Sequence, residues 1–282
     1  MAFEIFKVGG QLITDCATLK RVTKEIIEDY SKQNTRYLEL RSTPKVIGQI
    51  ETKEQYVLAI LEAIAEMSSQ LPRVKVGYIV SVNRASDPAL AVEAVDLASK
   101  LRETEHGRFL VGIELSGDPR KGSFADFKDQ FKRAQELGIK VTLHCAETAD
   151  QKAESQDMID FKPDRLGHCC FLTKEQIKQT VDMNIPVEIC PTSNVSATQC
   201  GLAQFLKHAQ EFTRLDHNVI ICCDDTLLFN TNLSMELFEF CKSFKIYDKE
   251  KIKQLLVRNV DAIFLDDPEF KQSLKDEILS KY

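Results

Sequence analysis

The chain has 282 residues, of which 43% are hydrophobic and 28% are charged, as in ordinary globular proteins. Its net charge of −6 at pH 7, its pI near 5.5 and the absence of a Lys/Arg cluster exclude nucleic acid as a partner. No apolar run approaches the ~18 residues of a membrane span, and the N-terminal segment has no signal-peptide pattern. We therefore expect a cytoplasmic protein, without a membrane partner, whose nine cysteines are reduced thiols.

The first part of the chain reads as a helix, a strand and a second helix. Residues 15–31 place apolar side chains on one helical face, and an apolar strand at 37–44 follows and ends in proline. The next helix begins at Thr52, where Thr-x-x-Gln is a capping-box pattern, and ends at Leu71. A strand followed by a helix is the repeating unit of parallel α/β folds.

The same unit recurs with different sequences. We expect further strands at 74–82, 109–115, 140–147, 165–168, 186–190 and 219–223. We expect helices between them at 87–101, 123–138, 150–161 and 173–183, and later ones at 232–245 and 248–264.

Seven such strands are one fewer than a closed parallel barrel needs. No change of composition marks a second domain, so we predict one domain over residues 1–282 with a charged C-terminal tail at 266–282. The predicted fold is α/β, a (β/α)8 TIM barrel of the metal-dependent hydrolase type. We expect the first βα unit to be the missing one, because helices and not strands follow the last predicted strand.

Three of the predicted strands end in side chains that can bind a metal ion or move a proton. One ends in His144 and Glu147, the next ends in His168, and the last ends in the pair Asp224 and Asp225. Active sites of parallel barrels lie at the carboxyl ends of the strands. Imidazole and carboxylate ligands with unliganded acid or base groups beside them suit a mononuclear zinc site. Each His could instead be a hydrogen-bonded structural residue.

Four motifs carry a resemblance to the adenosine/AMP deaminase family. They are Thr-Leu-His-Cys-Ala-Glu, Arg-Leu-Gly-His, Glu-Ile-Cys-Pro-Thr-Ser-Asn and Cys-Asp-Asp, in this order, and the resemblance extends from about Phe3 to about Leu265. It implies a zinc-dependent enzyme that removes the substituent at carbon 6 of a purine nucleotide or nucleoside by hydrolysis. The expected partner is thus a small molecule, the expected cofactor is one zinc ion per complete site, and we expect a monomer.

The resemblance also assigns roles to the strand-end residues. His144 and Asp224 are the implied zinc ligands, and Glu147 is the acid that protonates the purine ring beside the attacked carbon. His168 would orient the attacking water. Asp225 would accept protons from that water or hold the five-membered ring of the purine.

Residues before these motifs bear on substrate choice. Arg41, Ser42, Thr43 and Pro44 resemble the adenosine deaminase-like branch, which acts on N6-methyl-AMP. A guanidinium group and two hydroxyl groups are suitable partners for a 5′-phosphate. Alternatively, Arg41 pairs with a structural carboxylate.

Two further positions belong to the predicted binding site. Asn83 stands where the branch suggests an acidic residue near the sugar or phosphate. Gly117, in Ser-Gly-Asp-Pro, would leave room for the purine and offer its backbone amide to a ring nitrogen.

The chain lacks one pattern of the family. Members carry a His-x-His pair on the first strand, whereas His106, His208 and His217 have no such spacing and are expected at the surface. Two zinc ligands are therefore expected to be absent, which would weaken zinc binding and favour an unstable, inactive chain. The alternative function is a purine-binding remnant. A barrel amidohydrolase with two metal ions is disfavoured, because no bridging lysine is evident.

Overall fold

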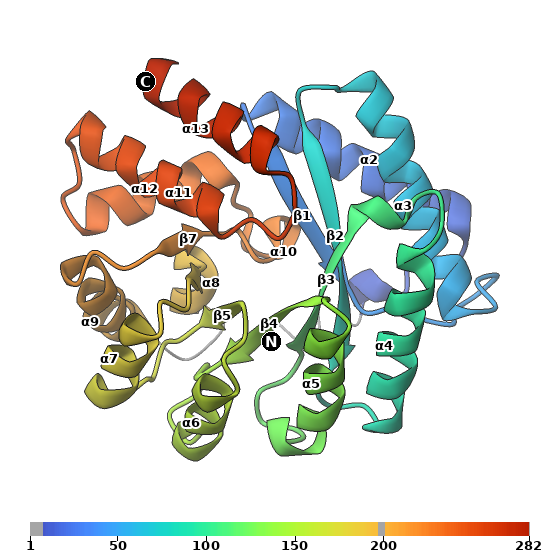
Figure 1. Ribbon diagram of the computed structural model, residues 1–282, viewed down its shortest axis with the longest axis horizontal. Helices are drawn as coiled ribbons and strands as arrows, with labels where there is room; N and C mark the ends of the chain where they lie inside the picture. The colour runs from blue at the N-terminus through green and yellow to red at the C-terminus, as the bar shows by residue number, and fades with distance from the viewer. Residues whose placement is uncertain (1–7, 197–200, 282) are drawn as a thin grey trace. The chain divides into compact units, whose positions relative to one another are not determined.

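The structure, a computed structural model, describes residues 8–196 and 201–281 (Figure 1). It divides into two compact units. One consists of Met1–Gly122 and Asp126–Val141, and the other consists of Ser123–Ala125 and Thr142–Tyr282. Parallel strands that alternate with helices build both units.

The first unit contains three parallel strands in chain order. They are β1 (Tyr37–Ser42), β2 (Lys75–Asn83) and β3 (Leu110–Ser116). The seven central residues of β2 are buried, as the apolar pattern predicts for a strand with neighbours on both sides. The helices of this unit are α2 (Cys16–Lys32), α3 (Lys53–Gln70), α4 (Ala89–Arg102) and α5 (Lys128–Glu136), and α2 and α3 lie side by side (Figure 1).

The second unit also has parallel strands in chain order, and the unit boundary falls inside the first of them. They are β4 (Lys140–Cys145), β5 (Arg165–His168), β6 (Val187–Ile189) and β7 (Val219–Ile221). Its helices are α6 (Lys152–Phe161), α7 (Lys174–Asp182), α8 (Pro191–Ser196), α9 (Gly201–Arg214), α10 (Thr226–Phe229), α11 (Leu233–Ser243), α12 (Lys249–Asp261) and α13 (Pro268–Lys281).

Local capping signals fix several helix starts. The predicted capping boxes are present at α3 and α7, where Thr52 and Thr173 each accept from a backbone N–H three residues on. The predicted charged tail is largely a helix, α13, which packs beside α12 (Figure 1). Its apolar residues Leu274 and Ile278, four apart, are buried, so this segment is part of the folded unit.

The predicted helix at 123–138 is interrupted. A 3-10 turn, Phe124–Asp126, precedes α5. The backbone N–H of Phe124 donates to the Glu154 carboxylate, at 2.6 Å, and the Ser123 hydroxyl accepts from the Ala125 N–H, at 3.3 Å. The carboxylate that takes this N–H comes from a segment 30 residues on, which the local pattern does not reveal.

Two histidines that were expected at the surface are buried. His208 is 2% exposed and His217 is 5% exposed, and His106 is half-buried. Each buried ring has a backbone partner, because His208 Nδ1 lies 3.3 Å from the Gln204 carbonyl oxygen and His217 Nε2 lies 2.7 Å from that of Ile185. An imidazole whose N–H has an acceptor can enter a core at little cost. The surface prediction for these two residues is wrong for this reason.

His217 should make the stability of the protein depend on pH. Burial lowers its pKa, with a further lowering from Arg258, against the opposing effect of the Ile185 carbonyl. As pH falls below the ordinary imidazole pKa of ~6.5, the unfolded chain takes up a proton that the folded chain resists. The stability contributed by His217 is therefore complete above about pH 6.5 and is lost as pH falls toward the lowered pKa.

We expect His217→Gln to reduce the fall in the free energy of unfolding at low pH, because the amide can still donate to the Ile185 carbonyl oxygen but does not titrate. Urea unfolding at about pH 7.5 and about pH 5.5 gives the two free energies for each protein. The same difference in both proteins would contradict the assignment.

A buried ion pair joins three strands of the second unit. Arg165 Nε on β5 lies 2.9 Å from Glu188 Oε1 on β6, and the Thr142 hydroxyl on β4 donates to the same oxygen, at 3.0 Å. The guanidinium also stacks on the Phe264 ring, 3.5 Å from its centroid, and donates to the Ala262 carbonyl oxygen, at 3.1 Å. This network links the sheet to the segment that follows α12.

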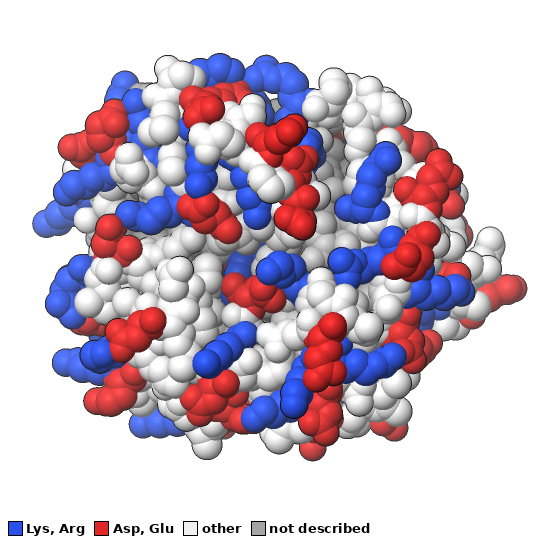
Figure 2. All heavy atoms as spheres, in the orientation of Figure 1, with Lys and Arg blue, Asp and Glu red and all other residues white. Residues whose placement is uncertain are grey.

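The visible surface carries both signs of charge. Lysine and arginine side chains are interspersed with aspartate and glutamate on the face in Figure 2. Among the described residues, no helix has the length and apolar character that a membrane span requires. The cysteines within residues 8–196 and 201–281 form no disulfide bond.

Candidate active site

Four predicted site residues gather at the strand ends of the second unit. We call His144, Glu147, His168 and Asp224 the strand-end cluster. His144 is in β4 and Glu147 follows it, His168 ends β5, and Asp224 follows β7. The first three of these side chains are buried, and Asp224 is half-buried.

The backbone at these strand ends is strained. His168 and Asp224 have φ of 62° and 57°, and Ala146 beside the cluster has φ of 52°. Left-handed backbone costs a residue with a Cβ roughly 1–2 kcal/mol, and such strain concentrates at functional sites. The Cys169 N–H donates to the Cys145 carbonyl oxygen, at 2.9 Å, and this bond helps to hold the end of β5 against β4.

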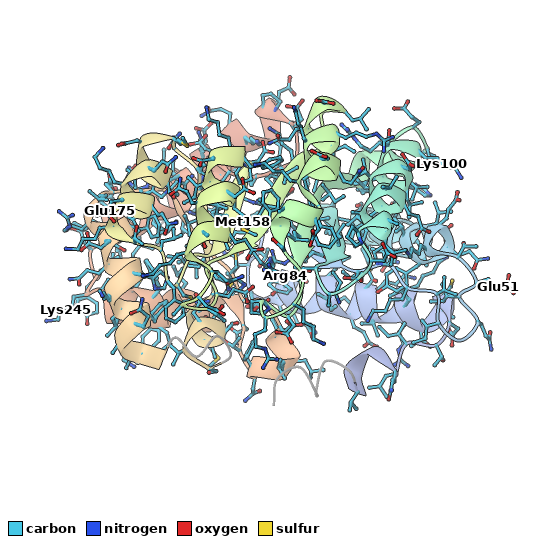
Figure 3. The ribbon with its side chains drawn as sticks, turned by 90° about the horizontal axis from the view of Figure 1, so that it is seen from below. Glu51, Arg84, Lys100, Met158, Glu175 and Lys245 are labelled. Atoms are coloured by element: carbon cyan, nitrogen blue, oxygen red, sulfur yellow. The ribbon has the colours of Figure 1, made fainter. Side chains whose placement is uncertain are left out.

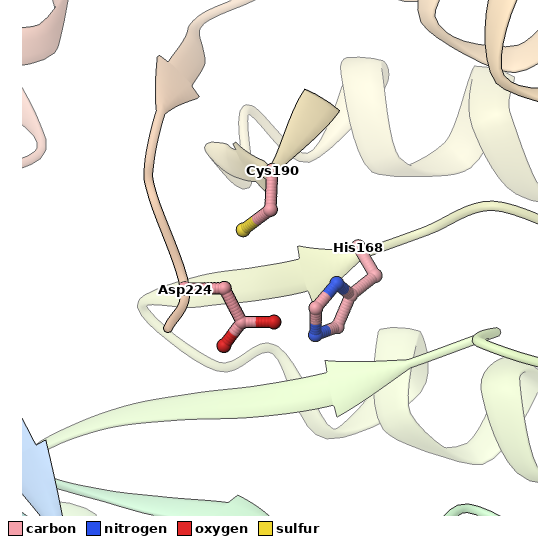
Figure 4. Close-up of side chains that lie close together, drawn as sticks. All are labelled: His168, Cys190 and Asp224. Carbon is pink, nitrogen blue, oxygen red and sulfur yellow. The ribbon is translucent and has the colours of Figure 1, made fainter. Parts of the chain in front are cut away.

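The side chains of the cluster face one another. The His144 and His168 rings meet edge to face, with centroids 4.7 Å apart and an interplanar angle of 66°. His168 Nε2 lies 3.9 Å from Glu147 Oε2. Ligand atoms of His168, Asp224 and Cys190 lie within 4.8 Å of one another, and Figure 4 shows the Asp224 carboxylate facing the His168 ring.

A second set of residues holds the cluster. The Ser193 hydroxyl donates to Asp224 Oδ2, at 2.7 Å, and the Asn194 amide nitrogen lies 2.9 Å from His168 Nδ1. No role was predicted for these two residues or for Cys190, although the motif Glu-Ile-Cys-Pro-Thr-Ser-Asn contains them. The signal was available, because they come soon after the apolar strand β6, as Glu147 comes after β4 and Asp224 after β7.

The donor set fits a divalent metal ion of the zinc type. The Asp224 carboxylate, the Cys190 thiol and the His168 imidazole bring their ligand atoms together, and all three are donor types that zinc accepts. The predicted ligand His144 contacts the His168 ring, and the predicted ligand Asp224 lies within 4.8 Å of a His168 ring nitrogen. Both therefore belong to the same site. Asp225 is the N-cap residue of α10 and is half-buried, and its role stays a prediction.

In the first unit, Arg41 forms an ion pair. Its Nη1 lies 2.9 Å from Glu114 Oε2, and the Glu114 side chain is 2% exposed. The Ser81 hydroxyl also donates to Glu114. This is the pairing with a carboxylate that the alternative interpretation of Arg41 predicts, so a phosphate would have to share the guanidinium with Glu114.

Ser42 belongs to a cluster of hydroxyl groups. Its Oγ lies 3.0 Å from the Tyr78 hydroxyl and accepts from the Tyr56 hydroxyl at 3.3 Å, and Tyr78 also donates to the Ser42 carbonyl oxygen, at 3.1 Å. Burial raises the pKa of both tyrosines, that of Tyr78 well above its ordinary value, so both phenols stay neutral donors. Thr43 is half-buried and Pro44 is buried.

Asn83, the last residue of β2, lies beside Gly117, which follows β3. Gly117 has φ of 108°, and a Cβ there would lie 2.4 Å from Asn83 Oδ1, so only glycine fits. Asn83 Oδ1 accepts from the Ala85 N–H, at 2.9 Å. The residue after Asn83, Arg84, labelled in Figure 3, is buried and donates through Nε to the Lys121 carbonyl oxygen, at 2.9 Å.

Parallel α/β units that place two imidazoles and two carboxylates at their strand ends define a hydrolase of the metal-dependent barrel class. A family model described as adenosine deaminase matches residues 3–281. The chain belongs to the adenosine deaminase family. It is therefore a hydrolytic deaminase with the parallel α/β fold of the TIM-barrel type, and the predicted family, fold class and enzyme class are confirmed.

Individual relatives agree with this membership. The N6-mAMP deaminase of Arabidopsis thaliana is 33% identical over 295 residues, which cover 97% of this chain and 81% of that protein. The N6-Methyl-AMP deaminase of Homo sapiens is 32% identical over 289 residues, covering 99% of this chain and 79% of that protein. The crystal structure of arabidopsis ADAL complexed with IMP has a TM-score of 0.89 at 33% identity, covering 99% of this chain and 82% of that chain.

Proposed function

We propose that the chain removes methylamine from N6-methyl-AMP by hydrolysis and forms IMP, with adenosine as a second, poorer substrate. The observation that carries this proposal is the convergence of His144, Glu147, His168 and Asp224 in a chain whose relatives are N6-methyl-AMP deaminases. The IMP bound to the related arabidopsis protein has the structure of the expected product. We further propose that the protein works in the cytoplasm as a monomer.

The metal ion would be held by His144 and Asp224. When bound there, zinc would supply hydroxide at neutral pH, because it lowers the pKa of a coordinated water from 15.7 to about 7. The purine ring is a poor electrophile until the nitrogen next to carbon 6 is protonated. Glu147, which is buried beside His168, would deliver that proton and hold the ring in its plane.

The remaining groups would position the reactants. His168 would hydrogen-bond the attacking oxygen, while Asp225 would accept a proton from it or contact the five-membered ring. The net reaction adds one water across the bond between carbon 6 and the methylamino nitrogen. The water oxygen stays on carbon 6, one water proton leaves with the amine as methylamine, and the other returns to Glu147 in place of the proton that the ring nitrogen of IMP keeps.

Residues of the first unit are proposed to bind the rest of the substrate. Gly117 would offer its backbone amide to the purine, and Asn83 would contact the sugar or phosphate. Arg41, Ser42, Thr43 and Pro44 would receive the 5′-phosphate. Since the Arg41 guanidinium faces Glu114 and the Ser42 hydroxyl faces two tyrosines, Thr43 is the side chain we assign to direct phosphate contact.

The nucleotide should be preferred over the nucleoside for this reason. A hydrogen bond to a charged group contributes about 1.5 to 3 kcal/mol, or roughly 10- to 150-fold in kcat/KM. We expect Thr43→Ala to lower kcat/KM for N6-methyl-AMP and AMP by about this factor and to leave adenosine turnover unchanged. Arg41→Ala is a poor test, because it would leave the buried Glu114 charge without its cation.

Steady-state kinetics with the three substrates checks this expectation. Thr104→Ala, which removes a hydroxyl that donates to the Leu101 carbonyl oxygen, is the control in the same unit. Equal kcat/KM for nucleoside and nucleotide in the unsubstituted protein would identify a plain adenosine deaminase instead.

A further inference from the structure

We propose that Asn194 is a positioning residue that fixes the tautomer of His168 and leaves its ring proton on Nε2. The inference rests on the proposed function for its catalytic meaning, since the Nε2–H group is then the donor that orients the attacking water. The tautomer itself follows from hydrogen bonds within the second unit.

The orientation of the Asn194 amide is set by the backbone. The Cys190 N–H lies 3.2 Å from Asn194 Oδ1, and a backbone N–H can only donate, so the oxygen of the amide must face Cys190. The NH2 group of the amide therefore points the other way, toward His168. A flipped amide would set two donors against each other at Cys190.

The amide then decides where the imidazole proton is. Asn194 Nδ2 lies 2.9 Å from His168 Nδ1, and an amide NH2 group can only donate. Nδ1 must accept, so the proton of the neutral ring is on Nε2.

Both side chains of this contact are buried. Asn194 is 0% exposed and His168 is 2% exposed, so bulk water cannot replace the amide. The first turn of α8 begins directly after β6, where the Asn194 N–H donates to the Cys190 carbonyl oxygen, at 2.8 Å. This turn folds the Asn194 side chain back over the strand end, between Cys190 and His168.

From its position, His168 could either bind a metal ion or donate a hydrogen bond, and the tautomer selects hydrogen-bond donation. Its ligand atoms lie close to those of Cys190 and Asp224, as in a metal site. A nitrogen that carries a proton cannot bind a metal ion, so Nε2 acts as a hydrogen-bond donor on the side of Glu147, 3.9 Å from that carboxylate. His144 and Asp224 are then left as the metal ligands of the strand-end cluster.

Imidazole nitrogen spectroscopy tests the tautomer directly. In 15N-histidine-labelled protein at about pH 8, long-range proton–nitrogen correlations show which ring nitrogen carries the proton. The chain contains its own references. His217 must carry its proton on Nε2, which faces the Ile185 carbonyl oxygen, and His208 must carry it on Nδ1, which faces that of Gln204.

We expect the His168 pattern of the unsubstituted protein to match that of His217. Asn194→Asp keeps the shape and the acceptor for Cys190 but presents a carboxylate to Nδ1, so the His168 pattern should change to that of His208. An Nδ1–H pattern in the unsubstituted protein, or no change in Asn194→Asp, would overturn the proposal. If the variant does not fold, the spectrum of the unsubstituted protein still decides.

Turnover tests the catalytic meaning separately. Asn194→Asp should lower kcat by about 100-fold, the smallest usual effect of losing a positioned proton donor, with little change in KM. Asn232→Asp introduces the same charge at the N-cap of α11, where a carboxylate can still accept from the Met235 N–H, and should keep normal kcat. A changed tautomer with normal kcat would refute the positioning role, whereas an inactive unsubstituted protein with the expected spectrum would refute only the proposed reaction.

Discussion

Replacing Glu147 by glutamine is expected to lower kcat for N6-methyl-AMP by at least ~100-fold, because the amide keeps the shape of the side chain but cannot deliver a proton. The metal content should stay unchanged, since Glu147 is not among the proposed ligands. Steady-state kinetics and metal analysis of the same preparation measure both quantities.

Two further variants make the Glu147 result specific. His144→Ala removes a proposed ligand and should lose the metal ion together with the activity. Glu175→Gln changes an acidic residue in the first turn of α7 and should alter neither. Near-normal turnover in Glu147→Gln would show that another group protonates the ring.

The second large effect should be on stability. Glu188→Ala leaves the Arg165 guanidinium buried without its carboxylate, and breaking a buried pair in this way costs about 3 to 5 kcal/mol. Glu188→Gln should cost less, because the amide oxygen can still accept from the Thr142 hydroxyl and keeps a polar group beside the Arg165 guanidinium. Urea unfolding gives the free energies.

A surface pair is the matched control for this prediction. Lys178 and Asp182, four residues apart on α7, form an exposed ion pair, and Asp182→Ala should change stability by at most about 1 kcal/mol. A loss as small as this in Glu188→Ala would show that water reaches Arg165 in the variant.

Elements whose signals are local could be predicted from the sequence. The capping boxes at Thr52 and Thr173 involve residues three apart, and both are present. The bounds of β5, 165–168, are those that the apolar pattern predicts. The interrupted helix at 123–138 was missed, because the Glu154 carboxylate that takes the Phe124 N–H belongs to a distant segment.

In the candidate site too, features with a local signal could be predicted and contacts between distant segments could not. His144, His168 and Asp224 could be located because parallel strands end on one edge of a sheet, which makes position in the chain a guide to position in space. The ion pair of Arg41 with Glu114 could be foreseen only as an alternative, because its partner is on a different strand. The contact of Asn194 with His168 could not be predicted, because it depends on the orientation of the Asn194 amide, which no sequence pattern encodes.

Hydrolysis of N6-methyl-AMP in 18O-labelled water tests the proposed function most directly. We predict that the protein, supplied with zinc, forms IMP with one labelled oxygen at carbon 6 and releases one methylamine for each IMP, as mass spectrometry would measure. Formation of AMP in place of IMP would mean that the methyl group and not the amine is removed. That result, or the absence of IMP from zinc-loaded folded protein, would contradict the proposed function.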